Sequence, residues 1–253
     1  MKVASWNVNS IKVRLEQALE WLDATQPDVL GLQEIKMLTE NFPTDEFLKA
    51  GYHSAVDGQK TYNGVALLSK QEPVDVVRGI PDFDDPQKRA IAASYGDTRV
   101  INLYVPNGQS VGSDKYAYKL SWLQALTDWL ASELQLHDKV VVMGDFNIAP
   151  DDRDVHDPAE WEGRILCSND ERAALQTLLD LGLTDSFRLF EQPEAAFSWW
   201  DYRAAGFRRN RGMRIDLLLV TKDINETIKA SDIDKEPRML ERPSDHAPVW
   251  VEF

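Results

Sequence analysis

Asp145 and Asn147 stand two positions apart where an apolar run ends, in the stretch VVVMGDFNIAP at 140–150. Side chains at positions i and i+2 of a strand point to the same side, so this spacing predicts that the carboxylate and the amide share a face. Functional groups are often carried at the ends of rigid strands, and we expect a larger polar set to converge there. The other members of this set are Asn7, Asn9, Glu34, Tyr104, Asp216, Asp245 and His246.

Each of these residues also has a purely structural interpretation. Asn9 precedes Ser10 and a helical pattern, and local sequence favours helix capping for it. Glu34 would pair with Lys36 on the surface, and Tyr104 would be a core aromatic with a satisfied hydroxyl. Asp and Asn after a strand often form turns. The number of carboxylates and amides at strand ends nevertheless favours one shared site.

The chemistry that such a set supports is phosphoester hydrolysis. Oxygen ligands without cysteine suit a hard cation such as Mg²⁺ or Mn²⁺, and Glu34 with Asp245 would provide enough carboxylates. His246 would contact a phosphate oxygen, with Asp216 fixing its tautomer. Asp145 would then orient or deprotonate a water. Acyl transfer is disfavoured because no Ser-His or Cys-His nucleophile motif is evident.

The elements that must position these residues do not follow a regular βαβ alternation. Helical spacing predicts helices near 11–22, over 115–136, and from a Ser168/Glu171 capping box through Leu181. Strands are predicted over 2–8, 28–34, 62–70, 90–95, 99–105, 139–145, 215–221 and 246–253. Runs of strands between few helices favour an α+β fold of two mixed sheets packed face to face, with helices outside. No Pro/Gly/Ser-rich linker divides the chain, so we expect one domain over residues 1–253.

Composition limits the setting of this chemistry. The 253 residues are 43% hydrophobic, which is enough for a sizeable core, and the single cysteine, Cys167, is typical of a reducing compartment. No apolar run has membrane length and no secretion signal is visible, so we expect a cytoplasmic protein without membrane contact. The formal net charge of −14 argues against a nucleic-acid partner. Residues 203–214 hold five Arg and no acid, however, and form either a solvated loop or a local DNA-binding field.

Six stretches resemble, in order, the signature blocks of the exonuclease III family of DNA repair nucleases, which belongs to the endonuclease/exonuclease/phosphatase superfamily. They are SWNVNSIKVR, PDVLGLQEIK, NGVALLSK, GDFNIAP, RGMRIDLLLV and RPSDHAPVWVEF. The resemblance implies a four-layer αββα sandwich with the site at one end. It implies metal-dependent incision 5′ to abasic sites, removal of 3′ blocking phosphates, and 3′→5′ exonuclease action on double-stranded DNA. We expect the protein to act as a monomer.

The resemblance also assigns roles to the catalytic residues. Asp145 would align and activate the attacking water. Asn147, His246 and Tyr104 would hold the scissile phosphate, and Asp216 would pair with His246.

For the metal, the resemblance implies that Glu34 binds Mg²⁺, supported by Asn7 and Asp245. Asn9 stands where some relatives carry a carboxylate near the metal, which leaves the metal affinity and the number of metal ions open. Mn²⁺ is an alternative to Mg²⁺.

The family builds a pocket for the base-less sugar, and here Trp199, Trp200 and Ile215 would line it, with one of the two Trp residues in the core instead. Leu166 falls near this pocket, where the text ILCSNDER departs from the family block. We hypothesise that Leu166 narrows the pocket and shifts preference toward 3′-end trimming. Contacts to the DNA backbone are predicted for Arg208, Arg209 and Arg211, and with weaker support for Lys88, Arg89, Lys115 and Lys119.

Two other functions are alternatives. One is a different phosphoesterase of the superfamily, such as a phosphoinositide phosphatase or a sphingomyelinase, against which the Arg-bearing loop argues. The other is a non-enzymatic nucleic-acid binder, which should have lost ligands that this chain retains.

Overall fold

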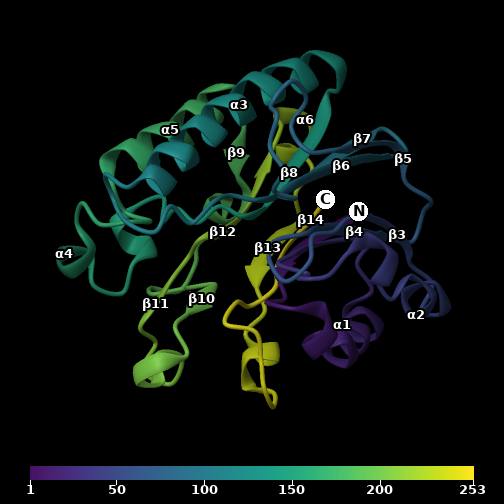
Figure 1. Cartoon of the computed structure of the whole chain (residues 1–253), viewed down its shortest axis with the longest axis horizontal. Coiled ribbons are helices and arrows are strands. Elements are labelled where there is room, and N and C mark those ends of the chain that lie inside the picture. The colour runs from purple at the N-terminus through teal and green to yellow at the C-terminus, as the bar shows by residue number, and fades with distance from the viewer.

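Two six-stranded sheets packed face to face form the centre of the protein, as a computed structural model describing residues 1–253 shows (Figure 1). The first sheet contains, in spatial order, β13 (Ala230–Ile233), β14 (Val249–Glu252), β1 (Lys2–Asn7), β2 (Val29–Gln33), β4 (Val65–Ser69) and β3 (His53–Asp57). The second contains β5 (Val74–Arg78), β6 (Ala90–Tyr95), β7 (Thr98–Tyr104), β8 (Lys139–Asp145), β12 (Asp216–Val220) and β9 (Thr184–Asp185). A separate short ribbon pairs β10 (Trp199–Trp200) with β11 (Gly212–Met213). The predicted α+β fold of two mixed sheets is confirmed.

Helices cover the outer faces of both sheets (Figure 1). The second sheet is covered by α3 (Asp114–Leu136) and α5 (Asn169–Asp180), and the first by α1 (Ile11–Thr25) and α2 (Thr44–Lys49). The short helices are α4 (Pro158–Trp161), α6 (Lys222–Asn225), η1 (Thr39–Asn41), η2 (Asp152–Asp154), η3 (Ser186–Leu189), η4 (Arg203–Ala205) and η5 (Glu236–Met239). None of the helices has the length and apolar character that crossing a membrane requires.

The central strands are buried on both faces. In β8, Val141 and Met143 point into the layer between the sheets, whereas Val140 and Val142 pack with residues of α3 and α5. This is why the sequence of the strand shows no polar alternation. Full burial of each such side chain contributes about 1.5–3 kcal/mol, so these strands form a rigid base for the residues at their ends.

Strand direction brings the predicted polar residues to one end of the sandwich. β1 runs parallel to β2 in the first sheet, and β7 runs parallel to β8 in the second. Because Asn7 at the end of β1 donates to Asp145 at the end of β8, all four strands finish at the same end of the sandwich. In register, Asp145 lies between Tyr104 of β7 and Asp216 of the antiparallel β12. In the first sheet, the pairing of β1 with β2 places Asn7, at the end of β1, beside Gln33.

The eight predicted strands and three predicted helices are present with small shifts of their ends. The capping box is confirmed: Glu171 N donates to Ser168 Oγ, and Ser168 N donates to Glu171 Oε2. Strands β3, β5 and β13 were not predicted, because their sequences, HSAVD, VDVVR and ASDI, are short and mix polar with apolar residues. Helices α2, α4 and α6 are too short to show a helical period.

Candidate active site

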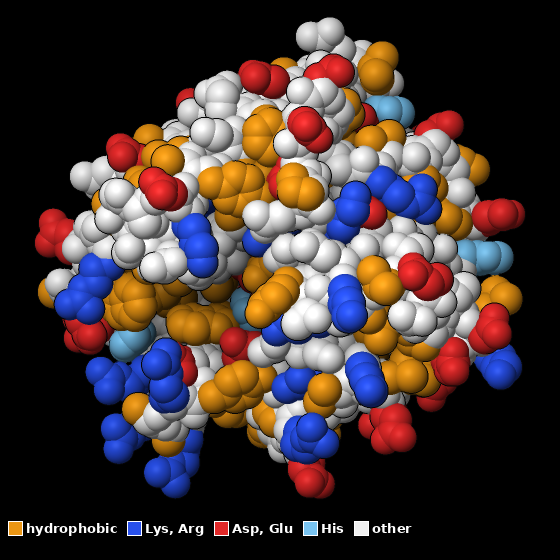
Figure 2. Space-filling model, in the orientation of Figure 1, with side chains coloured by type: hydrophobic (Ala, Val, Ile, Leu, Met, Phe, Trp, Pro, Cys, Tyr) orange, Lys and Arg blue, Asp and Glu red, His pale blue; other side chains and the backbone are white.

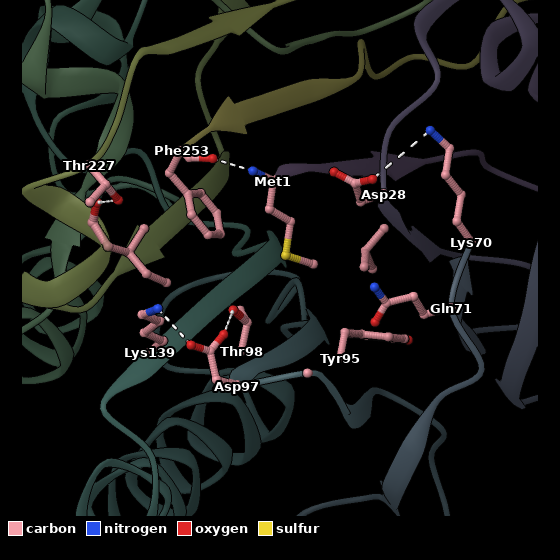
Figure 3. Close-up of a pocket in the computed structure, with 13 residues that line it drawn as sticks. Met1, Asp28, Lys70, Gln71, Tyr95, Asp97, Thr98, Lys139, Thr227 and Phe253 are labelled. Atoms are coloured by element: carbon pink, nitrogen blue, oxygen red, sulfur yellow. Dashed lines mark hydrogen bonds and ion pairs between the residues drawn. The ribbon is translucent and has the colours of Figure 1, made fainter.

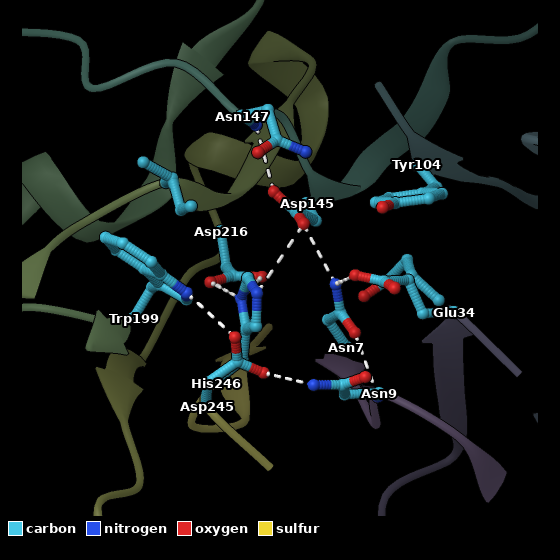
Figure 4. A network of polar contacts seen from close by, with 12 residues as sticks. Asn7, Asn9, Glu34, Tyr104, Asp145, Asn147, Trp199, Asp216, Asp245 and His246 are labelled. Atoms are coloured by element: carbon cyan, nitrogen blue, oxygen red, sulfur yellow. Dashed lines mark hydrogen bonds and ion pairs between the residues drawn. The ribbon is translucent and has the colours of Figure 1, made fainter. Parts of the chain in front are cut away.

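The predicted catalytic and metal residues converge at the end of the sandwich where β1, β2, β7 and β8 finish (Figure 4). They come from both sheets and from the loops that follow the strands. The residues gathered there are Asn7, Asn9, Glu34, Tyr104, Asp145, Asn147, Trp199, Asp216, Asp245 and His246.

Asp145 lies at the centre of this group and is only 1% exposed. Its Oδ2 accepts a hydrogen bond from Asn7 Nδ2 at 2.9 Å, and its Oδ1 accepts one from Asn147 N at 2.9 Å. Burial raises the pKa of this carboxyl above its usual value, although the charge of His246 acts in the opposite direction. The carboxylate is therefore held in one orientation and is more basic than an exposed one.

Asp145 depends on the glycine before it. Gly144 has a φ of +145°, and a Cβ atom there would lie 1.9 Å from the carbonyl oxygen of Leu103. Only glycine allows β8 to pass this close to β7 just before Asp145.

His246 forms an ion pair with Asp216, since its Nδ1 lies 2.9 Å from Asp216 Oδ2. Ser198 Oγ donates to the same Asp216 oxygen at 2.6 Å, and His246 Nε2 lies 3.7 Å from Asp145 Oδ2. Burial alone would lower the pKa of His246, but the charges of Asp216 and Asp145 outweigh it and raise the pKa well above the usual 6.5. The imidazole is thus a buried cation at neutral pH.

Glu34 provides a partly exposed carboxylate, with a side-chain exposure of 19%. Asn7 Nδ2 donates to Glu34 Oε1 at 3.0 Å, and Lys36 Nζ lies 2.9 Å from Oε2. Atoms of Glu34, Asp145 and His246 lie within 4.8 Å of one another, and of these the two carboxylates are free to ligate a metal while His246 carries its proton. Two carboxylates at this spacing fit a hard cation such as Mg²⁺. The predicted pairing of Glu34 with Lys36 is also present.

Asp245 lies outside that three-residue group. Its Oδ1 accepts a hydrogen bond from Asn9 Nδ2 at 2.9 Å, and its Oδ2 accepts one from Trp199 Nε1 at 3.0 Å. The prediction that Asn9 caps the following helix is wrong, because Ser10 is the N-cap and has no side-chain capping bond, while the Asn9 amide is turned to Asp245.

Asn147 reaches the site by a different route from the one that its spacing predicted. β8 ends at Asp145, and Asn147 has a φ of +49°, so the two residues are not on one extended strand. The Asn147 side chain donates to Val105 O and accepts from Asn107 Nδ2, at 3.0 and 3.1 Å. Glu34 also follows its strand with a positive φ, of 51°.

Two residues of the site were not among those predicted, namely Ser198 and Asn107. Asn107 follows β7 as Asn147 follows β8, so the same strand-end reasoning could have found it. Ser198 carries no signal in the sequence, because its role arises only from the packing of the β10–β11 ribbon against β12.

Tyr104 is partly buried, and the guanidinium of Arg89 lies 4.6 Å from the centre of its ring. Burial raises the pKa of the Tyr104 hydroxyl well above its usual value, so it is a neutral donor. Beside it lies a cavity of about 710 Å³ that is lined by Arg89, Asn107 and Lys115 among others. Lys115 is exposed, as a DNA contact requires, whereas Arg89 is largely buried and donates to Gln87 and to the Tyr104 carbonyl.

The predicted sugar-pocket residues Leu166, Ile215 and Trp199 belong to one apolar cluster. Leu166 is 4% exposed and has a φ of +72°, a conformation that favours glycine. Trp200 is not available to line the pocket, because it is fully buried in the core between the sheets. One of the two Trp residues is thus in the core, as the sequence suggested.

Comparison with known proteins agrees with this geometry. Residues 4–246 match the Endonuclease/Exonuclease/phosphatase family. The chain belongs to this family. It is 42% identical to exodeoxyribonuclease III of Haemophilus influenzae, with all of both chains covered. It superposes on the 3′-5′ exonuclease NExo from Neisseria meningitidis with a TM-score of 0.98 at 48% identity, covering 100% of this chain and 99% of the other. An AP endonuclease from Archaeoglobus fulgidus gives a TM-score of 0.96 at 38% identity over 100% and 99% of the two chains.

The Arg-rich loop of this family member is divided between surface and core. Arg208, Arg209 and Arg211 are exposed, and Figure 2 shows Lys and Arg side chains gathered at the lower left, over the β10–β11 region, beside a hollow in the surface. Arg214 is instead buried and pairs with Asp154 and Asp185 at 2.6 and 2.7 Å. The fifth arginine, Arg203, pairs with Asp201.

Lys119 is not a DNA contact, which corrects the weak prediction from sequence. It lies on α3, is fully buried, and pairs with Glu171, which is also fully buried. Lys88, from the same predicted group, is partly exposed and lies 3.8 Å from Asp57.

A further cavity, of about 740 Å³, lies at the opposite ends of the same strands (Figure 3). Its charged groups pair with one another: Lys139 lies 2.6 Å from Asp97, Lys70 lies 4.0 Å from Asp28, and the N-terminal amine donates to Phe253 O. The polar residues drawn in Figure 4 are all at the other end of the sandwich.

Proposed function

We propose that this protein is a Mg²⁺-dependent DNA repair nuclease of the exonuclease III type. It would remove 3′ blocking phosphates and 3′ nucleotides from double-stranded DNA and incise 5′ to abasic sites. One observation carries the proposal: a buried carboxylate, Asp145, is held by Asn7 and Asn147 between the His246–Asp216 pair and Glu34. The family membership and the names of the relatives, exodeoxyribonuclease III and 3′-5′ exonuclease, support it.

The reaction is an attack of water on phosphorus, in line with the departing 3′ oxygen. Asp145 accepts a proton from the water, and its raised pKa makes it a better base than an exposed carboxylate. The buried imidazolium of His246 donates to a phosphate oxygen and stabilises the charge that develops there. Asn147 and Tyr104 provide further neutral donors to the phosphate.

Mg²⁺ would be held by Glu34, with Asn7 and Asp245 as supporting residues. Asn7 suits this role because its side-chain amide donates hydrogen bonds to both Glu34 and Asp145 and so fixes the two carboxylates relative to each other. A bound cation of this kind neutralises charge on the phosphate oxygens. Lys36, already paired with Glu34, would have to move aside or share that carboxylate.

DNA would be held by the two basic regions that flank the catalytic group. Arg208, Arg209 and Arg211 lie on the side of the β10–β11 ribbon, and Arg89 and Lys115 line the cavity on the side of Tyr104. Such contacts neutralise phosphates and position the double helix without reading its sequence.

The deciding experiment uses two labelled DNA duplexes, one with a single abasic-site analogue and one with a 3′-phosphate, each with Mg²⁺ and with EDTA. We expect metal-dependent reaction on at least one of them. Cleavage only of a soluble inositol phosphate would favour another phosphoesterase of the family. Tight DNA binding without turnover at any metal concentration would favour the non-enzymatic alternative.

Leu166 would set the balance between the two DNA activities. Its side chain fills the apolar cluster that includes Ile215 and Trp199, where a base-less sugar would enter. We expect Leu166→Gly, which its φ of +72° accommodates, to raise abasic-site incision relative to 3′-phosphate removal by roughly tenfold or more. The measurement is the ratio of kcat/KM on the two duplexes, with Val155→Ala in the same cluster as the control. An unchanged ratio would show that Leu166 does not restrict the pocket.

A further inference from the structure

Lys119 is a buried cation that the proposed chemistry does not use directly. Its side chain has 0% exposure, and the ammonium group has three acceptors. It donates to the backbone carbonyls of Asn147, at 2.6 Å, and Asn107, at 3.2 Å, and it pairs with the Glu171 carboxylate. All three ammonium hydrogens thus have partners on three different segments of the chain.

Two of these segments carry the side-chain amides of Asn107 and Asn147, which contact each other close to Asp145. Asn107 Nδ2 donates to Asn147 Oδ1, and the backbone N–H of Asn147 donates to Asp145 Oδ1. Asn147 has a left-handed backbone, with φ at +49°, which must be maintained by its surroundings. The bond from Lys119 to the Asn147 carbonyl fixes the orientation of that peptide group.

The third segment leads to the predicted sugar pocket. Glu171 also accepts hydrogen bonds from Leu166 N at 3.1 Å, Ser168 N at 3.1 Å and Ser168 Oγ at 2.6 Å. One ion pair therefore joins α3 and α5 to the loops after β7 and β8 and to the loop that carries Leu166.

A buried ion pair is a weak means of stabilising a fold, because the cost of removing both charges from water offsets their attraction. Well-packed apolar side chains would often serve stability as well. What an apolar side chain does not supply is three oriented donors for carbonyl and carboxylate groups on separate loops.

We propose that Lys119 is a positioning residue for phosphoester hydrolysis: through the carbonyls of Asn147 and Asn107 it sets the two amides and Asp145 for the reaction. This proposal rests on the proposed function. Removing the ammonium should misplace the phosphate-holding groups and lower kcat while leaving the remote DNA contacts, and so KM, little changed.

The test compares Lys119→Met with the charge-balanced double variant Lys119→Met/Glu171→Gln, measuring stability in urea and kcat and KM on the preferred duplex. The single variant leaves Glu171 as an unpaired buried charge, so it loses both stability and rate. The double variant should recover part of the stability, because it removes the unpaired charge although an amide at position 171 keeps only one acceptor oxygen. Its kcat should stay roughly 100-fold below wild type, as a misplacement near 1 Å can cause. Recovery of both quantities together would overturn the proposal.

A matched control lies on the same helix. Arg99 and Glu133 form another buried pair, at 2.7 Å, toward the end of α3 that is remote from the site. Arg99→Met/Glu133→Gln should keep a wild-type kcat, and an equal fall of kcat there would mean that Lys119 acts only through general stability. The side-chain amide NMR signals of Asn107 and Asn147 give a readout without turnover, and they should shift in the Lys119 double variant alone. Failure of the proposed function would appear in the wild-type enzyme, whereas failure of this proposal would appear only in the variants.

Discussion

The properties of single residues in the site follow from burial and from fixed partners. Asp145 is removed from water and accepts hydrogen bonds from Asn7 and Asn147, so its carboxylate keeps one orientation before any substrate arrives. Preorganised groups of this kind act without reorganising during the reaction, which is where much catalytic stabilisation originates. The charge of His246 beside it is maintained by Asp216 rather than by solvent.

Asp145→Asn should therefore lower kcat by roughly 10²–10⁴, the contribution of a positioned general base. Asn has nearly the same shape but does not accept the proton from water. Because the basic flanks are unchanged, binding of the duplex measured by fluorescence anisotropy in EDTA should stay near the wild-type value. A parallel loss of binding would indicate that Asp145 holds the DNA instead of activating water.

The His246–Asp216 pair should also make stability depend on pH. The folded-state pKa of His246 is raised above the value of 6.5 for the free side chain, because Asp216 and Asp145 favour its charged form. The stabilisation from this group is therefore fully present below pH 6.5 and is lost as the pH rises through the folded-state pKa.

We accordingly expect the difference in unfolding free energy between wild type and His246→Gln to be largest below pH 6.5 and to shrink toward high pH. Urea unfolding of the metal-free proteins at a series of pH values measures it. A difference that is constant with pH would mean that His246 does not carry the inferred charge.

At the scale of elements, the sheets were predictable and the turns that leave them were not. The strands 139–145 and 215–221 follow from apolar runs, and their pairing places Asp145 beside Asp216. The chain then leaves the extended conformation, so the period-two argument for Asn147 does not apply, although the residue still reaches the site. Positive φ angles and partners distant in sequence, such as Asp245 for Asn9, cannot be read from local patterns.

Burial of large polar or aromatic residues was equally hard to predict. Arg214 is buried only because Asp154 and Asp185 come from elsewhere in the chain to pair with it, and Lys119 is buried because of Glu171. Both residues occur in sequence stretches that would suit an exposed basic surface. The charge of a residue therefore does not show whether its side chain is exposed or forms an internal ion pair.

Gly144→Ala tests whether the backbone at the end of β8 can move to make room for a side chain. A new Cβ would meet the Leu103 carbonyl at 1.9 Å, so we expect the loss of stability to exceed the roughly 1–3 kcal/mol of backbone strain alone, together with a large fall in kcat. Gly182→Ala is the control, because its φ of +102° is also positive but nothing lies within 4 Å of the new atom. Urea midpoints and kcat for the two variants should separate strain from steric displacement of Asp145. Equal effects would show that β8 adjusts easily.

At the scale of the whole molecule, charge is distributed unevenly. The chain has a formal net charge of −14, yet Arg208, Arg209 and Arg211 are exposed together on the ribbon side of the site. A net negative protein can bind DNA if its local field at the site is positive, and the acidic remainder disfavours other orientations. The exposed Lys115, which lines the cavity beside Tyr104, adds a further positive charge near the site.

Changing Arg208, Arg209 and Arg211 to Gln should weaken binding to every duplex and reduce its dependence on salt. Each lost phosphate contact lowers the slope of log K against log salt by about 0.9, because fewer counterions are released on binding. The matched control changes Lys70, Lys222 and Lys229, which are exposed and lie at the opposite end of the sandwich, so that the same charge is removed. Anisotropy titrations over a range of KCl concentrations give the slopes. If both triple variants lose slope equally, the effect is one of net charge, and the loop does not form the DNA contact. If only the arginine variant loses slope, and its kcat at saturating DNA stays near wild type, the loop binds the DNA backbone and the chemistry belongs to the sheet ends alone.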